Sequence, residues 1–274
     1  MKKKIIHCAV IQMNSGDDRE ENLRQAETLV GEAADAGAQI VALPENFARM
    51  PDPQGPPPDG ESREGPIVAW ARRTAKKDKI YLLAGSFPER SRTPGKAYNT
   101  SVLLSPEGAV LAAYRKIHLF DVTLPGGESH RESRRVIAGE EAVAAETPLG
   151  RMGMTICYDL RFGYLYRRLA ELGALLVFVP AAFTEQTGEA HWEVLIRSRA
   201  IENQVFIAAP AQQGLHPGGR RTYGHSLIVD PWGTILAEIT KGDGIALAAL
   251  DLDYQAQVRK AMSCRDHRVN QIYQ

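Results

Sequence analysis

The sequence contains few cysteines, no excess of charge of either sign and no long apolar run. Its three cysteines, Cys8, Cys157 and Cys264, lie far apart and form no CxxC pair. This spacing excludes a disulfide framework and a thiolate zinc site, and reduced thiols suit a cytoplasmic protein. With 33 basic and 33 acidic residues, no global field attracts nucleic acid or an anionic membrane. No apolar segment reaches the roughly 20 residues that span a bilayer.

The N-terminal segment MKKKIIHCAVIQM superficially resembles a signal peptide. Its apolar run is short, is interrupted by His7 and Gln12, and is not followed by a small-residue cleavage site. We therefore interpret residues 5–12 as a first strand of a cytoplasmic domain.

Strand and helix patterns alternate along the chain, and the second half repeats the plan of the first. In the first half, apolar periodicity and proline or glycine stops predict helices over about 17–36 and 67–77, strands over 40–45 and 80–87, and a hairpin over 98–116. In the second half, the same signals predict strands over 151–159, 173–180 and 205–210, helices over 162–172 and 189–202, and a hairpin over 223–239.

The two predicted hairpins align without gaps, which indicates an internal repeat. Tyr98 aligns with Tyr223, and Pro106 with Pro231. Two copies of one α/β plan predict two mixed sheets with helices outside. If the halves face each other, they form a four-layer α-β-β-α sandwich with pseudo-twofold symmetry. No linker separates the halves, so we predict a single domain over residues 1–274. A Rossmann fold is not indicated, because no GxGxxG follows the first strand.

Cys157 is the first candidate for chemistry. It ends the apolar run RMGMTIC, and a helix pattern begins near Phe162. A nucleophile on a sharp strand-to-helix turn is exposed, and nearby backbone N–H groups can bind an oxyanion. The competing interpretation is a buried structural thiol, a common state of free cysteine.

Glu45 and Lys116 also follow predicted strands. Glu45 comes directly after Pro44 at the end of an apolar strand, where partial burial would raise its pKa toward that of a general base. Lys116 ends a hairpin strand and can offer a fixed positive charge to an oxyanion, while its neighbour Arg115 faces the opposite way. The alternatives are a helix N-cap partner or a solvated loop acid for Glu45, and a surface lysine for Lys116. No histidine has a stronger context, and no GxSxG motif is present.

Together these residues carry a resemblance to a known family. LPEN with Glu45, YRKIHLFD with Lys116 and ICYDLRF with Cys157 resemble the three signature blocks of the nitrilase superfamily of carbon–nitrogen hydrolases. The similarity runs from about residue 5 to residue 253. It implies the four-layer fold, assembly into homodimers or larger homo-oligomers, a Glu–Lys–Cys catalytic set, and no metal or cofactor. The family's second glutamate falls at Glu132, with Glu128 as the alternative.

The resemblance also implies a mechanism. Glu45 takes the thiol proton, Cys157 attacks an amide carbonyl, and Lys116 with the backbone N–H of Tyr158 stabilises the oxyanion. A thioester forms, which water then hydrolyses. Glu132 positions Lys116 or the substrate.

Further blocks, FDVTLPG, AFTEQTGEAHWEVLIRSRAIENQ and YGHSLIVDPWG, resemble the branch that contains deaminated glutathione amidase and ω-amidase. The YGH triplet at 223–225 and Asp230 favour the deaminated glutathione amidases. Such a small amide carries carboxylates, for which Arg161 and Arg199 are candidate ligands, and Phe183 and Thr187 are candidate pocket residues.

Three other functions stay open. These are an ω-amidase acting on 2-oxoglutaramate, a hydrolase of N-carbamoyl or general aliphatic amides, and a catalytically silent interaction module of the same fold.

Overall fold

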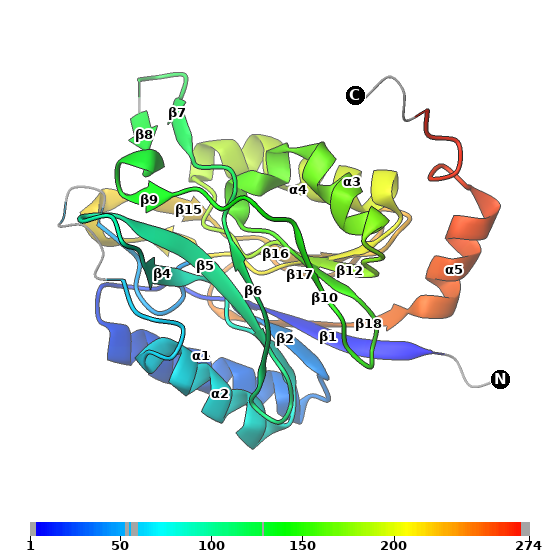
Figure 1. Ribbon diagram of the computed structural model, residues 1–274, viewed down its shortest axis with the longest axis horizontal. Coiled ribbons are helices and arrows are strands. Elements are labelled where there is room, and N and C mark those ends of the chain that lie inside the picture. Colours follow the sequence, from blue (N-terminus) through cyan, green and yellow to red (C-terminus); the bar gives the residue numbers. More distant parts are fainter. Residues whose placement is uncertain (1–3, 53–54, 56–59, 128, 270–274) are drawn as a thin grey trace.

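The computed structural model describes residues 4–52, 55, 60–127 and 129–269. Two mixed sheets pack face to face, and a pair of helices covers the outer face of each sheet (Figure 1). The predicted four-layer α-β-β-α sandwich is confirmed.

The first sheet contains the N-terminal strands and one strand from the C-terminal end. Its order is β18 (Gly244–Asp251), β1 (Ile5–Gln12), β2 (Ile40–Ala42), β3 (Tyr81–Leu83), β5 (Ala97–Leu104) and β4 (Phe87–Arg90), with β6 (Val110–Arg115) and β9 (Val136–Ile137) also paired to β5. Strand β1 runs parallel to β2 and antiparallel to β18. Helices α1 (Arg19–Asp35) and α2 (Pro66–Asp78) cover the outer face.

The second sheet comes from the second half of the chain. Its order is β10 (Val143–Ala145), β11 (Met152–Met154), β12 (Leu176–Phe178), β13 (Phe206–Ala209), β16 (Ser226–Val229) and β17 (Ile235–Ile239). Helices α3 (Gly163–Glu171) and α4 (Glu185–Asn203) cover it, and α5 (Leu252–Ala261) follows β18 at one end (Figure 1). Two short ribbons, β7 (Asp121–Thr123) with β8 (Ser129–Arg131) and β14 (Gln213–Leu215) with β15 (Arg221–Tyr223), stand apart from the sheets.

Side-chain alternation in β1 shows how the layers are held together. Val10 packs between the sheets with Phe178 and Ile207, whereas its neighbour Ile11 packs toward α1 with Val30. Because successive strand residues face opposite ways, β1 contributes to both cores.

Two of the predicted strands are cut short at residues with a positive φ. The predicted strand 151–159 stops at Met154, because Cys157 has a φ of 49°, and residues 157–161 form a 3₁₀ turn instead. The predicted strand 80–87 is interrupted at Gly85, whose φ is +35° and where a Cβ atom would lie 2.0 Å from the carbonyl oxygen of Pro44. That close approach packs the segment leading to Glu45 against the segment around Gly85.

Candidate active site

Cys157 occupies a strained turn directly after strand β11. Its left-handed φ is costly for a non-glycine residue and persists only where surrounding contacts impose it. Here the Cys157 N–H donates to the carbonyl of Pro180 at 2.9 Å, and the Thr155 N–H donates to that of Phe178 at 3.2 Å. The next strand therefore holds the turn, and Cys157 is 7% exposed. The turn presents the thiol at the floor of a pocket rather than within the sheet.

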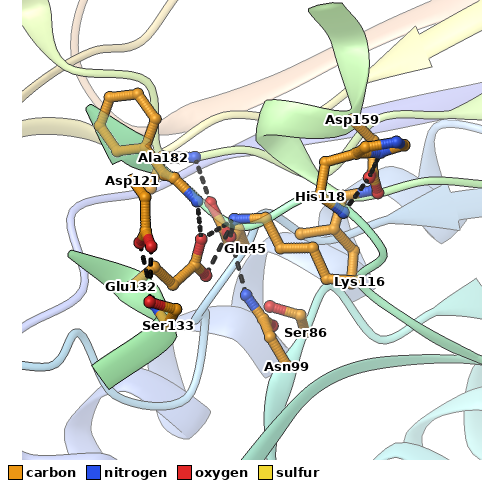
Figure 2. A network of polar contacts seen from close by, with 12 residues as sticks. Glu45, Ser86, Asn99, Lys116, His118, Asp121, Glu132, Ser133, Asp159 and Ala182 are labelled. Carbon is orange, nitrogen blue, oxygen red and sulfur yellow. Dashed lines mark hydrogen bonds and ion pairs between the residues drawn. The ribbon is translucent and has the colours of Figure 1, made fainter. Parts of the chain in front are cut away.

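The buried carboxylate of Asp159 joins this turn to the segment that carries Lys116. It accepts hydrogen bonds from the Ile156 N–H at 2.9 Å and the Tyr114 hydroxyl at 2.6 Å. It also accepts from the His118 backbone N–H at 3.0 Å and contacts the His118 Nδ1 at 2.6 Å (Figure 2). One side chain therefore fixes two candidate catalytic segments relative to each other.

Lys116 is a buried ammonium between two carboxylates. Its Nζ lies 3.1 Å from Glu45 Oε1 and 3.0 and 2.9 Å from the two oxygens of Glu132 (Figure 2). Burial by itself lowers the pKa of this ammonium, but the charges of Glu132 and Glu45 outweigh burial, so the pKa of Lys116 is raised. Lys116 is therefore a permanent positive charge at neutral pH.

Glu45 is equally buried and fully engaged. Its Oε2 accepts the backbone N–H of Ala182 at 2.9 Å, and its Oε1 accepts the Asn99 amide at 2.9 Å (Figure 2). Burial raises the pKa of Glu45, but Lys116 and Arg220 lower it by more, so the net shift is downward. The expectation of a raised pKa is wrong, because it considered burial without the two cations.

The Cys157 thiol lies beside the Glu45 carboxylate. Burial and the Glu45 charge raise the pKa of this thiol, against the smaller opposing effect of Lys116. The resting site therefore combines a neutral thiol, an ionised carboxylate and an ammonium.

Glu132, one of the two candidates for the second glutamate, contacts Lys116. It begins a 3₁₀ turn, and besides Lys116 its Oε2 accepts the Phe120 N–H at 2.6 Å. Asp121 fastens the same loop by accepting the Ser133 N–H at 3.0 Å (Figure 2). Glu128 lies outside the described residues.

A pocket of about 870 Å³ opens above these groups, a size suited to a small organic substrate. Four of the predicted substrate-binding residues line it: Tyr158, Arg161, Phe183 and Thr187.

Arg199, the fifth predicted substrate-binding residue, does not lie among the pocket-lining residues, and this part of the prediction is corrected. Its Nε donates to the Leu160 carbonyl at 2.9 Å and its Nη1 to Glu202 at 2.9 Å, so it is buried behind the cysteine turn.

Three contributors were not anticipated from the sequence. Asn99 begins the polar run Asn99–Ser101 of strand β5, so its polarity did not set it apart from its neighbours. Ala182 acts through its backbone N–H and has no side-chain signature. Arg220 belongs to an Arg-Arg pair in a loop, where charge alone does not mark a site.

Across the described residues, no group of three or more His, Cys, Asp or Glu side chains is placed to hold a metal ion. No helix in the same part of the chain is long and apolar enough to cross a membrane.

Residues 7–260 match the carbon–nitrogen hydrolase family. A protein of Synechocystis described as deaminated glutathione amidase is 43% identical over 265 residues, which cover 96% of this chain and 97% of the relative. Fold and sequence therefore define the class, and the chain belongs to the carbon–nitrogen hydrolase family within the nitrilase superfamily. The prediction of an amide-cleaving enzyme is confirmed.

Solved structures agree with this assignment. The NitFhit protein of C. elegans superposes with a TM-score of 0.89 at 34% identity, covering 100% of this chain and 67% of that one. A mutant of the amidase from Nesterenkonia sp. superposes with a TM-score of 0.76 at 26% identity, covering 96% of this chain and 95% of that one. In that amidase, the acetamide moiety of fluoroacetamide is attached covalently at the active-site cysteine.

Proposed function

We propose that the protein hydrolyses deaminated glutathione through a covalent thioester on Cys157, with Glu45 as the base and Lys116 as the oxyanion-stabilising cation. The observation that carries this proposal is the meeting of a thiol, an ionised carboxylate and an ammonium at the floor of one pocket.

In the first half-reaction, the Cys157 sulfur attacks the amide carbonyl as its proton passes to Glu45. Because the pKa of the thiol is raised and that of Glu45 is lowered, proton transfer accompanies attack rather than preceding it. Negative charge develops on the carbonyl oxygen, where the Lys116 ammonium and the Tyr158 N–H stabilise it. Glu45 then protonates the departing amine, and a thioester remains.

In the second half-reaction, a water molecule enters where the amine left. Glu45 removes a proton from this water as its oxygen attacks the thioester carbonyl. Collapse of the second tetrahedral intermediate releases the acid and returns the proton to Cys157. Glu132 acts throughout by holding the Lys116 ammonium in place with both carboxylate oxygens.

The proposed substrate rests on sequence similarity and on the charge of the pocket. The Synechocystis relative is described as a deaminated glutathione amidase. Deaminated glutathione carries two carboxylates, and the pocket-lining residues include six arginines, Lys116 and four carboxylates, so the lining carries more positive than negative groups. Arg161 lies over the Phe183 ring at 5.3 Å and is proposed to face a substrate carboxylate.

A product-release screen tests this assignment. Purified protein is incubated separately with deaminated glutathione, 2-oxoglutaramate and an N-carbamoyl amide, and both 2-oxoglutarate and ammonia are quantified. We expect the highest kcat/KM on deaminated glutathione, with release of 2-oxoglutarate and no ammonia. Preferential turnover of 2-oxoglutaramate, which releases both products, would instead identify an ω-amidase.

We also propose that residues 1–274 form one domain of a cytoplasmic homo-oligomer. An exposed apolar surface, made of Val194 and Ile201 on α4 with Trp232 in the loop before β17, supports self-association. Ile201 packs beside Gly233, the residue after Trp232, and Val194 lies about two helical turns before Ile201 on the same face of α4. Adjacent exposed apolar residues mark interaction surfaces more often than isolated ones.

A further inference from the structure

Arg220 is the pocket arginine most directly tied to the reacting groups. It lies in the turn between β14 and β15, and its Nη2 donates to the Ala182 carbonyl at 2.5 Å. The N–H of Ala182 in turn donates to Glu45 and lies beside the Cys157 sulfur. Arg220 is also close enough to Glu45 to lower the pKa of that carboxyl. The Arg220 guanidinium is therefore close enough to contact the far end of a short acyl chain attached to Cys157.

Four of the other five pocket arginines have different surroundings, and the fifth, Arg161, lies over the Phe183 ring. Arg135 donates to the carbonyls of Asp52 and Gly55, which fixes one loop to another. Arg131 donates to the Val122 and His130 carbonyls within its own ribbon. The Arg49, Arg131 and Arg134 side chains are exposed, at the rim of the pocket.

The Arg220 guanidinium has unused hydrogen-bonding capacity. A guanidinium carries five N–H donors. Among the described residues, its one hydrogen bond is that from Nη2 to Ala182. Its Nε is buried and has no partner in this part of the chain. A ligand in the pocket does not reach the buried Nε, but Nη1 and the second N–H of Nη2 are paired with no described residue and remain available to a carboxylate.

The turn that carries Arg220 is rigidly built. The buried His216 N–H donates to the Arg220 carbonyl at 2.8 Å, its Nδ1 lies 3.0 Å from the Ser15 carbonyl, and its Nε2 lies 2.6 Å from the Thr222 hydroxyl. A carbonyl can only accept, so Nδ1 donates and Nε2 accepts from the hydroxyl. Burial lowers the pKa of His216, which keeps this neutral tautomer at physiological pH. Arg220 is therefore pre-organised before substrate binds.

We propose that Arg220 is a specificity-determining residue that binds the carboxylate of the acyl half of the substrate. This inference rests on the proposed function and deepens it. The acyl half of the substrate occupies the site in both half-reactions, first as the amide and then as the thioester on Cys157. Because Arg220 contacts Ala182, which contacts Glu45, it can hold the acyl carboxylate in both states. The preferred substrates are amides whose acyl chain ends in a carboxylate, and neutral aliphatic amides are discriminated against.

Substitution of Arg220 tests this assignment, because the loss of a binding residue should change KM and leave kcat nearly unchanged. Carboxylate binding is equal in the ground state and the transition state, so Arg220→Gln should raise KM for deaminated glutathione about 10- to 100-fold with kcat within about threefold of wild type. By calorimetry, the Kd for 2-oxoglutarate should rise by a similar factor. Arg220→Lys, which keeps the charge without the planar fork, should fall between the two.

The adjacent Arg221 provides the matched control. It pairs with Glu185 at 2.9 Å and its side chain is 56% exposed, so Arg221→Gln removes the same charge from the same turn without touching the pocket. Its KM and Kd should stay at wild-type values.

Three results would overturn the inference. The first is a fall of kcat at unchanged KM in Arg220→Gln, which would show that Arg220 only positions Ala182 and Glu45. The second is an unchanged Kd for 2-oxoglutarate in a folded Arg220→Gln protein, and the third is an equal loss in Arg221→Gln. Failure of the proposed function looks different, since the wild-type protein itself would then show no turnover of deaminated glutathione.

Discussion

At the scale of single residues, the buried charges of the site stabilise one another by pairing. Lys116 and Glu45 are 2% and 3% exposed, and each would be costly to bury alone. Their pairing leaves the ammonium permanently charged and the carboxylate ionised beside a neutral thiol. This arrangement suits a reaction in which the proton moves only when the sulfur attacks.

Lys116→Ala tests the cation directly. We expect kcat to fall about 10²- to 10³-fold, because an oxyanion stabiliser is lost, while KM changes little. Stopped-time product assays with deaminated glutathione measure both constants. Arg115→Ala is the control, since Arg115 faces away and pairs with Glu89 at 2.7 Å. If both variants lose turnover equally, the assignment of Lys116 is wrong.

The pKa shifts predict the pH profile of kcat/KM. Glu45 must be ionised, and its pKa is lowered, so the acid limb should lie below the ordinary glutamate value of about 4.3. The pKa of Cys157 is raised, so no thiolate limb should appear near about 8.5. In Lys116→Ala, which lacks one of the lowering charges, the acid limb should move to higher pH. A rise of wild-type activity with a midpoint near the ordinary thiol pKa would contradict this mechanism.

At the scale of secondary-structure elements, the sequence predicted the regular parts better than the turn that matters most. Strand β1 follows from its apolar run with residues 5–12 as predicted, and α1 begins after Asp18, whose side chain accepts from two N–H groups of the first turn. The left-handed conformation of Cys157 could not be predicted, because it is imposed by partners distant in sequence, such as Pro180, and by the buried Asp159. The cysteine's context could be recognised, but its geometry could not.

The link between the cysteine turn and the lysine segment can be weakened at one atom. Tyr114→Phe removes the hydroxyl that donates to Asp159 at 2.6 Å. We expect a loss of about 1–3 kcal/mol in the free energy of unfolding, because a buried carboxylate loses a donor. Urea denaturation measures this loss. Tyr254→Phe, at a side chain that is 36% exposed, should change stability by less than about 0.5 kcal/mol. Equal stability of both variants would show that Asp159 does not depend on this contact.

At the scale of the whole molecule, the internal repeat allowed the four-layer architecture to be predicted, and the pocket could be predicted only in part. Glu45, Lys116 and Cys157 stand out because each follows an apolar strand. Arg199 was misplaced because helix α4 directs its side chain toward the Leu160 carbonyl, behind the cysteine turn. The sequence shows that the residue is charged but not which way the helix directs it. Arg220 was missed because its position depends on a separate ribbon.

Self-association is the prediction at this scale. We expect light scattering to show a dimer or a larger homo-oligomer, and Ile201→Glu to shift the protein toward the monomer by placing a charge in the apolar surface on α4. Leu215→Glu, at an exposed apolar residue on β14, is a control that should leave the mass unchanged. A wild-type monomer at micromolar concentration would contradict the proposal.

The most direct test of the central claim is acid-quenched mass spectrometry of the protein during turnover of deaminated glutathione. We predict that the 2-oxoglutaryl group is found on the peptide that contains Cys157, and that Cys157→Ala shows neither this adduct nor product. An acyl group on another residue, or normal product release by Cys157→Ala, would contradict the account.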